Sequence, residues 1–219
     1  MKPQWDPREI LRYLGADHAT PLIQELMERG QRETEEVSRP KSVFLPLPIQ
    51  VEEDRVFLGE KAFASKSLAS HLRGCREGYL FAFTLGREID MRLKRYAVTD
   101  LPYVPVLQAC AASYTELCAD LAQEELRESA RRRGLYLRPR YSPGYGDFSL
   151  QAQTFFFEAL QIPKRLGVSL TEGYLMVPTK SITGVIGLTS DPTQCHVGRC
   201  MSCDAQNCPF REKECSPHE

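Results

Sequence analysis

The chain has 219 residues, 42% of them apolar, so it can bury a hydrophobic core without disulfide bonds. Its 28 Lys and Arg residues almost balance its 29 Asp and Glu residues, which argues against bulk electrostatic binding of nucleic acid. No apolar run approaches the ~20 residues that span a bilayer and the N-terminus does not resemble a signal peptide, so we expect a cytoplasmic protein without a membrane or nucleic-acid partner.

The N-terminal third alternates helical and extended patterns. Asp6 followed by Pro7 is typical of a helix start, and Gly15 is typical of a helix end. Prolines and alternating apolar residues indicate extended segments after the second helix. The patterns predict, in order, helices over residues 6–14 and 20–39, strands over residues 42–50 and 54–59, and a helix over residues 65–72.

The remaining two thirds begin with a dense apolar run that is typical of a buried strand. The pattern then predicts a strand over residues 79–86, helices over residues 87–96 and 100–134, a helix over residues 149–160, and an antiparallel pair formed by residues 171–177 and 181–188. Cys110 and Cys118 lie on or beside the apolar stripe of the long helix, so we interpret both as core residues. The order of the elements predicts an α+β fold.

Residues 138–147 form a loop that is rich in Arg, Pro, Tyr and Gly. Proline stiffens such a loop, and glycine lets the backbone approach a ligand closely. Arg140 could hold a carboxylate in a two-pronged hydrogen bond, which would suit a small ligand with an amino-acid end. The same composition is also common in ordinary structural turns, and that alternative stays open at this level.

Residues 140–145 match the Arg-x-x-x-Gly-Tyr motif of the activation domain of cobalamin-dependent methionine synthase. The sequence resembles this family well beyond the motif, credibly over residues 75–190 and more loosely over the first 74 residues. The matching segments are residues 79–86, 100–128, 167–172 and 176–184. The resemblance implies a curved antiparallel sheet with flanking helices, assigned to residues 1–190.

The resemblance also implies a ligand, a reaction and a place in methionine biosynthesis. S-adenosylmethionine would be bound through the carboxylate contact of Arg140, the backbone from Ser142 to Gly144, and the packing of Tyr145. The family reaction is the reductive methylation of cob(II)alamin, for which a flavodoxin or ferredoxin would supply one electron. Because the chain has no Asp-x-His-x-x-Gly corrinoid motif, we expect it to serve in trans as the activation subunit of a methyltransferase system. The cobalamin would be held by a methionine synthase chain or another corrinoid protein.

The C-terminal residues 191–219 carry a second motif. Cys195, Cys200, Cys203 and Cys208 lie within 14 residues, and Cys215 follows. In a reducing compartment, such a cluster of thiolates indicates a zinc or iron–sulfur site. Because the implied reaction needs an electron, an iron–sulfur cluster is favoured slightly over zinc. Cys215 could replace Cys195 as the fourth ligand, and a reduced tail without metal is the remaining alternative.

Two other functions stay open. The family's pair of ligand-binding tyrosines has no counterpart in residues 191–196, and its acidic ligand contact in an N-terminal arm cannot be aligned here. These differences favour a non-catalytic module that binds or regulates a corrinoid protein and has a structural zinc tail. They also fit a metal-dependent interaction protein with a vestigial pocket. The intact segment from Arg140 to Tyr145 favours the reactivating function.

Overall fold

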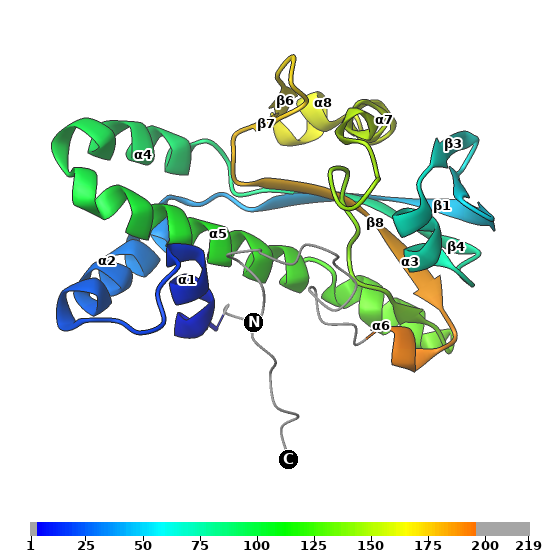
Figure 1. Cartoon of the computed structure of the whole chain (residues 1–219), viewed down its shortest axis with the longest axis horizontal. Helices are drawn as coiled ribbons and strands as arrows, with labels where there is room; N and C mark the ends of the chain where they lie inside the picture. Colours follow the sequence, from blue (N-terminus) through cyan, green and yellow to red (C-terminus); the bar gives the residue numbers. More distant parts are fainter. Residues whose placement is uncertain (1–3, 196–219) are drawn as a thin grey trace.

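The computed structural model describes residues 4–195, and their side chains as far as residue 193. The helices and strands follow one another along the chain in the order shown in Figure 1. They are α1 (Pro7–Leu14), α2 (Pro21–Val37), β1 (Lys41–Glu52), β2 (Arg55–Leu58), β3 (Lys61–Ala64), α3 (Lys66–Leu72), β4 (Glu77–Thr84), α4 (Glu88–Thr99), η1 (Leu101–Tyr103), α5 (Val104–Leu121), α6 (Glu124–Arg132), β5 (Tyr136–Leu137), η2 (Leu150–Ala152), α7 (Gln153–Leu160), α8 (Ile162–Leu166), β6 (Ser169–Leu170), β7 (Met176–Val177), β8 (Ser181–Thr189) and η3 (Pro192–Cys195).

The helix starts in the first third are set by local capping. The side chain of Asp6 accepts a hydrogen bond from the Arg8 amide, and Thr20 and Ser65 cap α2 and α3 in the same manner. Gly15 ends α1 in the left-handed conformation. The helices and strands that were predicted up to and including α4 are confirmed, whereas β3 was not predicted.

The main sheet has six antiparallel strands in the order β3-β2-β1-β4-β8-β5. This confirms the predicted α+β fold with an antiparallel sheet and flanking helices. The predicted hairpin between residues 171–177 and 181–188 is wrong, because β7 pairs with β6, and β8 pairs with β4 and β5. The reason is burial. Along β8 nearly every residue is buried, so this strand lies inside the sheet rather than in a surface hairpin.

The predicted single helix over residues 100–134 is also wrong, because α5 ends at Leu121 and α6 begins at Glu124. In an unbroken helix the amide of Gln123 would bond to the carbonyl of Ala119. Here that amide bonds to the carbonyl of Asp120 instead, and the buried Gln123 side chain donates to Ala119 at 2.8 Å. A side chain thus replaces the backbone bond, and the helix changes direction.

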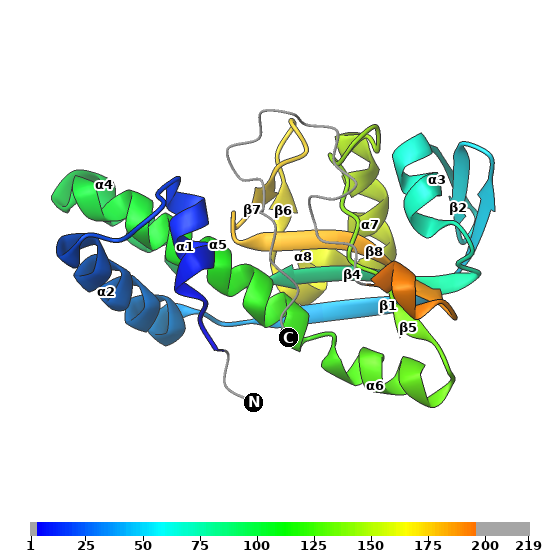
Figure 2. The same cartoon turned by 60° about the horizontal axis from the view of Figure 1, so that its bottom comes forward.

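Helices cover both faces of the sheet (Figures 1 and 2). On β4, Leu80 and Ala82 face a core shared with α3, α7 and α8, while Phe81 and Phe83 face a core shared with α5. This two-residue alternation is expected of a strand that is covered on both sides. A third cluster joins α1 and α2 to α5, so α5 packs on the sheet and also carries the N-terminal helices.

Among the described helices, none combines the length and the apolar character that crossing a bilayer would require.

Candidate functional site

The loop that carries Arg140 runs along the outer edge of β8. After β5, the Arg138 amide donates to the Gly187 carbonyl at 2.9 Å. Tyr141 and Val185 then exchange two backbone hydrogen bonds, of 3.0 and 2.9 Å. The backbone on both sides of Arg140 is therefore hydrogen-bonded to β8, and these bonds fix the position from which the Arg140 side chain extends.

Two glycines make this arrangement possible. A Cβ atom on Gly184 of β8 would lie 3.2 Å from the Tyr141 carbonyl oxygen and 3.5 Å from the Arg140 Cβ. Gly144 has a φ of 96°, which L side chains rarely adopt, and its amide donates to the Phe148 carbonyl at 2.7 Å. The first glycine lets the loop approach β8, and the second lets it turn back.

The far end of the loop is tied to α3. The Asp147 carboxylate accepts hydrogen bonds from the Ser65 hydroxyl at 2.5 Å and from the amides of Lys66 and Ser67 at 2.8 and 3.0 Å. These donors, the Ser65 hydroxyl first, hold the pKa of Asp147 well below its usual range. Asp147 thus stays ionised and links the loop to the N-terminus of α3, where a negative charge is favourable.

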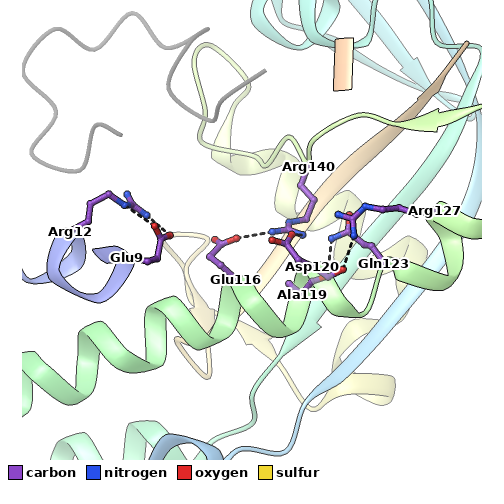
Figure 3. Close-up of polar contacts among 8 residues, drawn as sticks. All are labelled: Glu9, Arg12, Glu116, Ala119, Asp120, Gln123, Arg127 and Arg140. Atoms are coloured by element: carbon purple, nitrogen blue, oxygen red, sulfur yellow. Dashed lines mark hydrogen bonds and ion pairs between the residues drawn. The ribbon is translucent and has the colours of Figure 1, made fainter. Parts of the chain in front are cut away.

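Successive side chains of the loop point to opposite faces of the sheet. The ring of Tyr141 packs 4.8 Å from the ring of His71 in α3 and belongs to the core on the α3 and α7 face. Arg140 points the other way, toward α5 (Figure 3). There its Nη2 lies 2.7 Å from Oε2 of Glu116, and its Nη1 lies 2.6 Å from Oδ1 of Asp120.

Arg140 is therefore a nearly buried cation held by two carboxylates. Its side chain is 9% exposed, whereas those of Glu116 and Asp120 are 26% and 42% exposed. Hydrogen bonds between ionised partners of this kind are short and strong. Arg140 is thus paired rather than open to solvent.

A cleft of about 240 Å³ adjoins these ion pairs, between α5 and the N-terminal segment. It is lined by Gln4, Asp6, Glu9, Ser113, Glu116, Leu117 and Asp120. Figure 3 shows Glu9 of α1 beyond Glu116 along α5. Glu9 is itself paired with Arg12 at 2.6 Å. Four of the seven lining residues are acidic, and each also forms an ion pair with an arginine, so a cationic ligand group would share these carboxylates with the arginines.

The structure separates the predicted ligand residues into two groups. Arg140 faces the acidic cleft, whereas the exposed Tyr145 packs edge-on against Tyr141, with ring centroids 5.9 Å apart. Ser142 and Gly144 form the turn between them, and the Ser142 carbonyl accepts from the Tyr145 amide at 3.2 Å. The four residues thus share one loop, but only Arg140 reaches α5.

Sequence reasoning missed the acidic residues of the cleft. Glu116 and Asp120 are the only charged residues in α5, and they lie four apart, so they share one side of an otherwise uncharged helix. That isolated pair was a usable signal. Asp6 and Glu9 carried no such signal, because acidic residues are common in the first turn of a helix.

The three described cysteines outside the C-terminal cluster lie in the hydrophobic core. Cys75, Cys110 and Cys118 are buried and form no disulfide bond within the described residues, which confirms that Cys110 and Cys118 are core residues. Burial raises the pKa of Cys110 to about 12 and that of Cys118 to about 11. Within residues 4–193, no three His, Cys, Asp or Glu residues lie so that they could hold a metal ion together. The predicted ligands Cys200, Cys203 and Cys208, and the reserve Cys215, lie outside the described residues, as does the side chain of Cys195.

The fold has a counterpart among solved structures. The crystal structure of the MetH reactivation domain bound to AdoHcy superposes with a TM-score of 0.61 at 19% sequence identity. The match covers 86% of this chain and 71% of the other chain. At this identity the similarity shows the fold alone. A search of curated protein sequences finds no match.

The sequence itself identifies the family. The profile described as "Vitamin B12 dependent methionine synthase, activation domain" matches residues 78–212, which is more than half of the chain. The match includes the loop with Arg140 and all of α5 and β8. It confirms the resemblance seen in residues 140–145. The chain belongs to the family of vitamin B12-dependent methionine synthase activation domains.

Proposed function

We propose that this chain binds S-adenosylmethionine between Arg140 and the acidic cleft, and that it reactivates a corrinoid protein on another chain by reductive methylation. The observation that carries the proposal is a nearly buried arginine at the edge of an acidic cleft in a member of this family. The similar solved structure is bound to AdoHcy, the demethylated form of this ligand, which further supports it.

The charges of the ligand match those of the site. S-adenosylmethionine has a carboxylate, an ammonium group and a positively charged sulfonium. The guanidinium of Arg140 has five N–H donors in a fork that suits a carboxylate. Glu116 and Asp120 line the cleft beside it, and Asp6 and Glu9 lie across from them, where they suit the two cationic groups.

The size of the cleft indicates which part of the ligand it holds. Its volume of about 240 Å³ is below the range of roughly 300–1,000 Å³ that is usual for drug-sized ligands. We therefore assign the amino-acid end of the ligand to the cleft. The adenosine would lie against the backbone from Ser142 to Gly144, and it would contact the Tyr145 ring only if that ring left its packing against Tyr141.

The reaction requires positioning more than acid–base chemistry. The methyl group passes from the sulfonium to the cobalt of cob(II)alamin with one electron from a flavodoxin or ferredoxin, and S-adenosylhomocysteine is released. No proton is transferred in this balance, so this chain need supply no general base. Arg140 and the cleft carboxylates would orient the ligand, and fixed orientation is itself a large source of rate enhancement.

A second function is favoured by one specific observation. Because Glu116 and Asp120 already pair with Arg140, this arginine could serve only to hold the loop to α5. The chain would then bind or regulate a corrinoid protein without transferring a methyl group.

We also propose that the C-terminal cysteines bind one metal centre. Four thiolates within 14 residues suit zinc or an iron–sulfur cluster. An iron–sulfur cluster would give the electron an entry point, whereas zinc would have a structural role. The family match extends to residue 212, so it includes the four proposed ligands.

One experiment separates these functions. The purified chain would be mixed with cob(II)-loaded methionine synthase that lacks its activation domain, together with a reductant and S-adenosylmethionine, and the corrinoid spectrum followed. The proposal expects conversion to methylcobalamin only when both the chain and S-adenosylmethionine are present. Binding of the corrinoid protein without conversion would favour the regulatory module. Homocysteine methylation by this chain alone would contradict action in trans.

A further inference from the structure

We propose that Asp120 occupies the position on Arg140 that the carboxylate of the ligand takes when it binds. Asp120 would then be an internal competitor that lowers the affinity for ligands with a carboxylate and leaves ligands without one unaffected. This inference rests on the proposed function, because it assumes that S-adenosylmethionine binds at Arg140.

The two carboxylates that hold Arg140 are not equivalent. Asp120 is 42% exposed and contacts Nη1, whereas Glu116 is 26% exposed and contacts Nη2. Asp120 is the next-to-last residue of α5, directly before the break in the helix. The more exposed carboxylate regains water more easily when it leaves, so it is the partner that can be exchanged.

The backbone around Asp120 permits this exchange without refolding. The Asp120 carbonyl accepts from the amide of Gln123 at 3.2 Å and from Arg127 Nη1 at 3.1 Å. These contacts hold the main chain of the helix break in place (Figure 3). A change of side-chain rotamer is therefore sufficient to move the carboxylate away from Arg140.

Glu116 would keep Arg140 in place during the exchange. A guanidinium that is 9% exposed is costly to leave without a counter-charge. If Glu116 stays on Nη2 while a ligand carboxylate replaces Asp120 on Nη1, Arg140 keeps two negatively charged partners throughout. Glu116 is thus a positioning residue, and Asp120 is the partner that the ligand carboxylate displaces.

The Asp120 carboxylate would remain at the cleft after it leaves Arg140. The freed Asp120 carboxylate would lie beside a lining that already includes Asp6 and Glu9. The ammonium and sulfonium groups of the ligand would offset it. A ligand that has the cations but no carboxylate cannot replace Asp120 on Arg140, so it would bind next to an intact ion pair.

The test compares two ligands by calorimetry, S-adenosylmethionine and its decarboxylated analogue. Asp120→Asn should tighten binding of S-adenosylmethionine by about three- to tenfold, because a competitor worth up to about one surface ion pair is removed. The same change should leave the decarboxylated analogue unchanged or weaken its binding, because it loses an attractive charge. Asp120→Ala should behave alike, and thermal melting would verify that both variants are folded.

Two further variants complete the design. Glu125→Gln removes one negative charge from an exposed position in the first turn of α6, so it serves as the matched control and should alter neither affinity. Glu116→Gln should weaken binding of S-adenosylmethionine, because the positioning partner of Arg140 is lost. The opposite signs at positions 116 and 120 distinguish exchange from a general charge effect.

The outcomes separate the inference from the function on which it rests. Equal or weaker binding of S-adenosylmethionine by Asp120→Asn and Asp120→Ala, with normal binding by the unchanged protein, would overturn the exchange but leave the proposed function intact. Binding that is detectable only in the Asp120 variants would support both. An absence of binding in every folded variant and in the unchanged protein would overturn both.

Discussion

The Nε2 atom of His71 in α3 lies 2.9 Å from the carbonyl oxygen of Pro139, the residue before Arg140. A carbonyl oxygen can only accept, so Nε2 carries the proton in this bond. Burial lowers the pKa of His71 to about 4, with the nearby charge of Arg138 acting in the same direction and the bond to Pro139 opposing it. The imidazole is thus neutral at neutral pH and fastens the loop to α3.

The burial of neutral His71 predicts that acid weakens the fold. A histidine with a lowered pKa in the folded state contributes its full stability above its unfolded pKa of about 6.5. That contribution falls as the pH drops to about 4, because the unfolded chain binds a proton that the folded chain does not. We expect a loss of at most about 3 kcal/mol over this window. Urea unfolding from pH 7 to pH 4 would measure it, and a matching slope in His71→Gln would assign the effect elsewhere.

Replacing Arg140 should weaken the ligand complex. Arg140→Ala removes a charge-assisted contact, so we expect the affinity for S-adenosylmethionine to fall by about 2 kcal/mol in calorimetry. Arg132→Ala, at an exposed position in the last turn of α6, is the control and should bind like the unchanged protein. Binding curves that coincide for both variants would remove Arg140 from the site.

The close approach at Gly184 can be tested separately from charge. In Gly184→Ala the new Cβ would lie 3.2 Å from the Tyr141 carbonyl oxygen, which is closer than most such contacts, so the loop must move away from β8. We expect several-fold weaker binding of S-adenosylmethionine, because Arg140 shifts with the loop. Gly173→Ala is the control, since its Cβ would meet nothing closer than Thr171 Oγ1 at 3.9 Å. Unchanged affinity in Gly184→Ala would show that the loop position is not critical.

The link between the loop and α3 should stabilise the fold. Asp147→Ala removes the acceptor of three hydrogen bonds at the start of the helix, and loss of such a cap costs about 1–2 kcal/mol. Because the pKa of Asp147 is lowered, this contribution should be present at neutral pH and be lost in strong acid. Denaturant unfolding would measure it, with Glu60→Ala in the exposed turn after β2 as the control. Equal midpoints for the two variants would argue against the cap.

The cysteine cluster predicts one metal centre per chain. An iron–sulfur cluster would make anaerobically purified protein brown, with visible absorption that bleaches on reduction, whereas zinc would leave it colourless with about one zinc per chain. Replacing Cys200 and Cys203 with Ser should abolish the metal and leave S-adenosylmethionine binding intact. Cys215→Ser should retain the metal if Cys195 is the fourth ligand. Metal-free protein from metal-replete anaerobic growth would refute the cluster.

The sequence by itself determined the features that depend on neighbouring residues. Helix starts at Asp6, Thr20 and Ser65 were predictable, because a capping side chain bonds to an amide two or three residues away. The buried strand β4 was predictable because its apolar run is continuous. The motif from Arg140 to Tyr145 and the matching segments over residues 75–190 identified the family and the loop that carries the site, and the order of the elements predicted the α+β fold.

Only the tertiary structure decided the partners of these elements. The assignment of β8 between β4 and β5 depends on pairing with residues about 50 and 100 positions away, which a local pattern cannot specify. Arg140 is fixed by Glu116 and Asp120, which lie 24 and 20 residues away in α5. Asp6 and Glu9 join the same cleft only because α1 packs on α5. A residue type shows what a side chain can bind, but folding decides which charges face it, because the pairing energy depends on distance and burial.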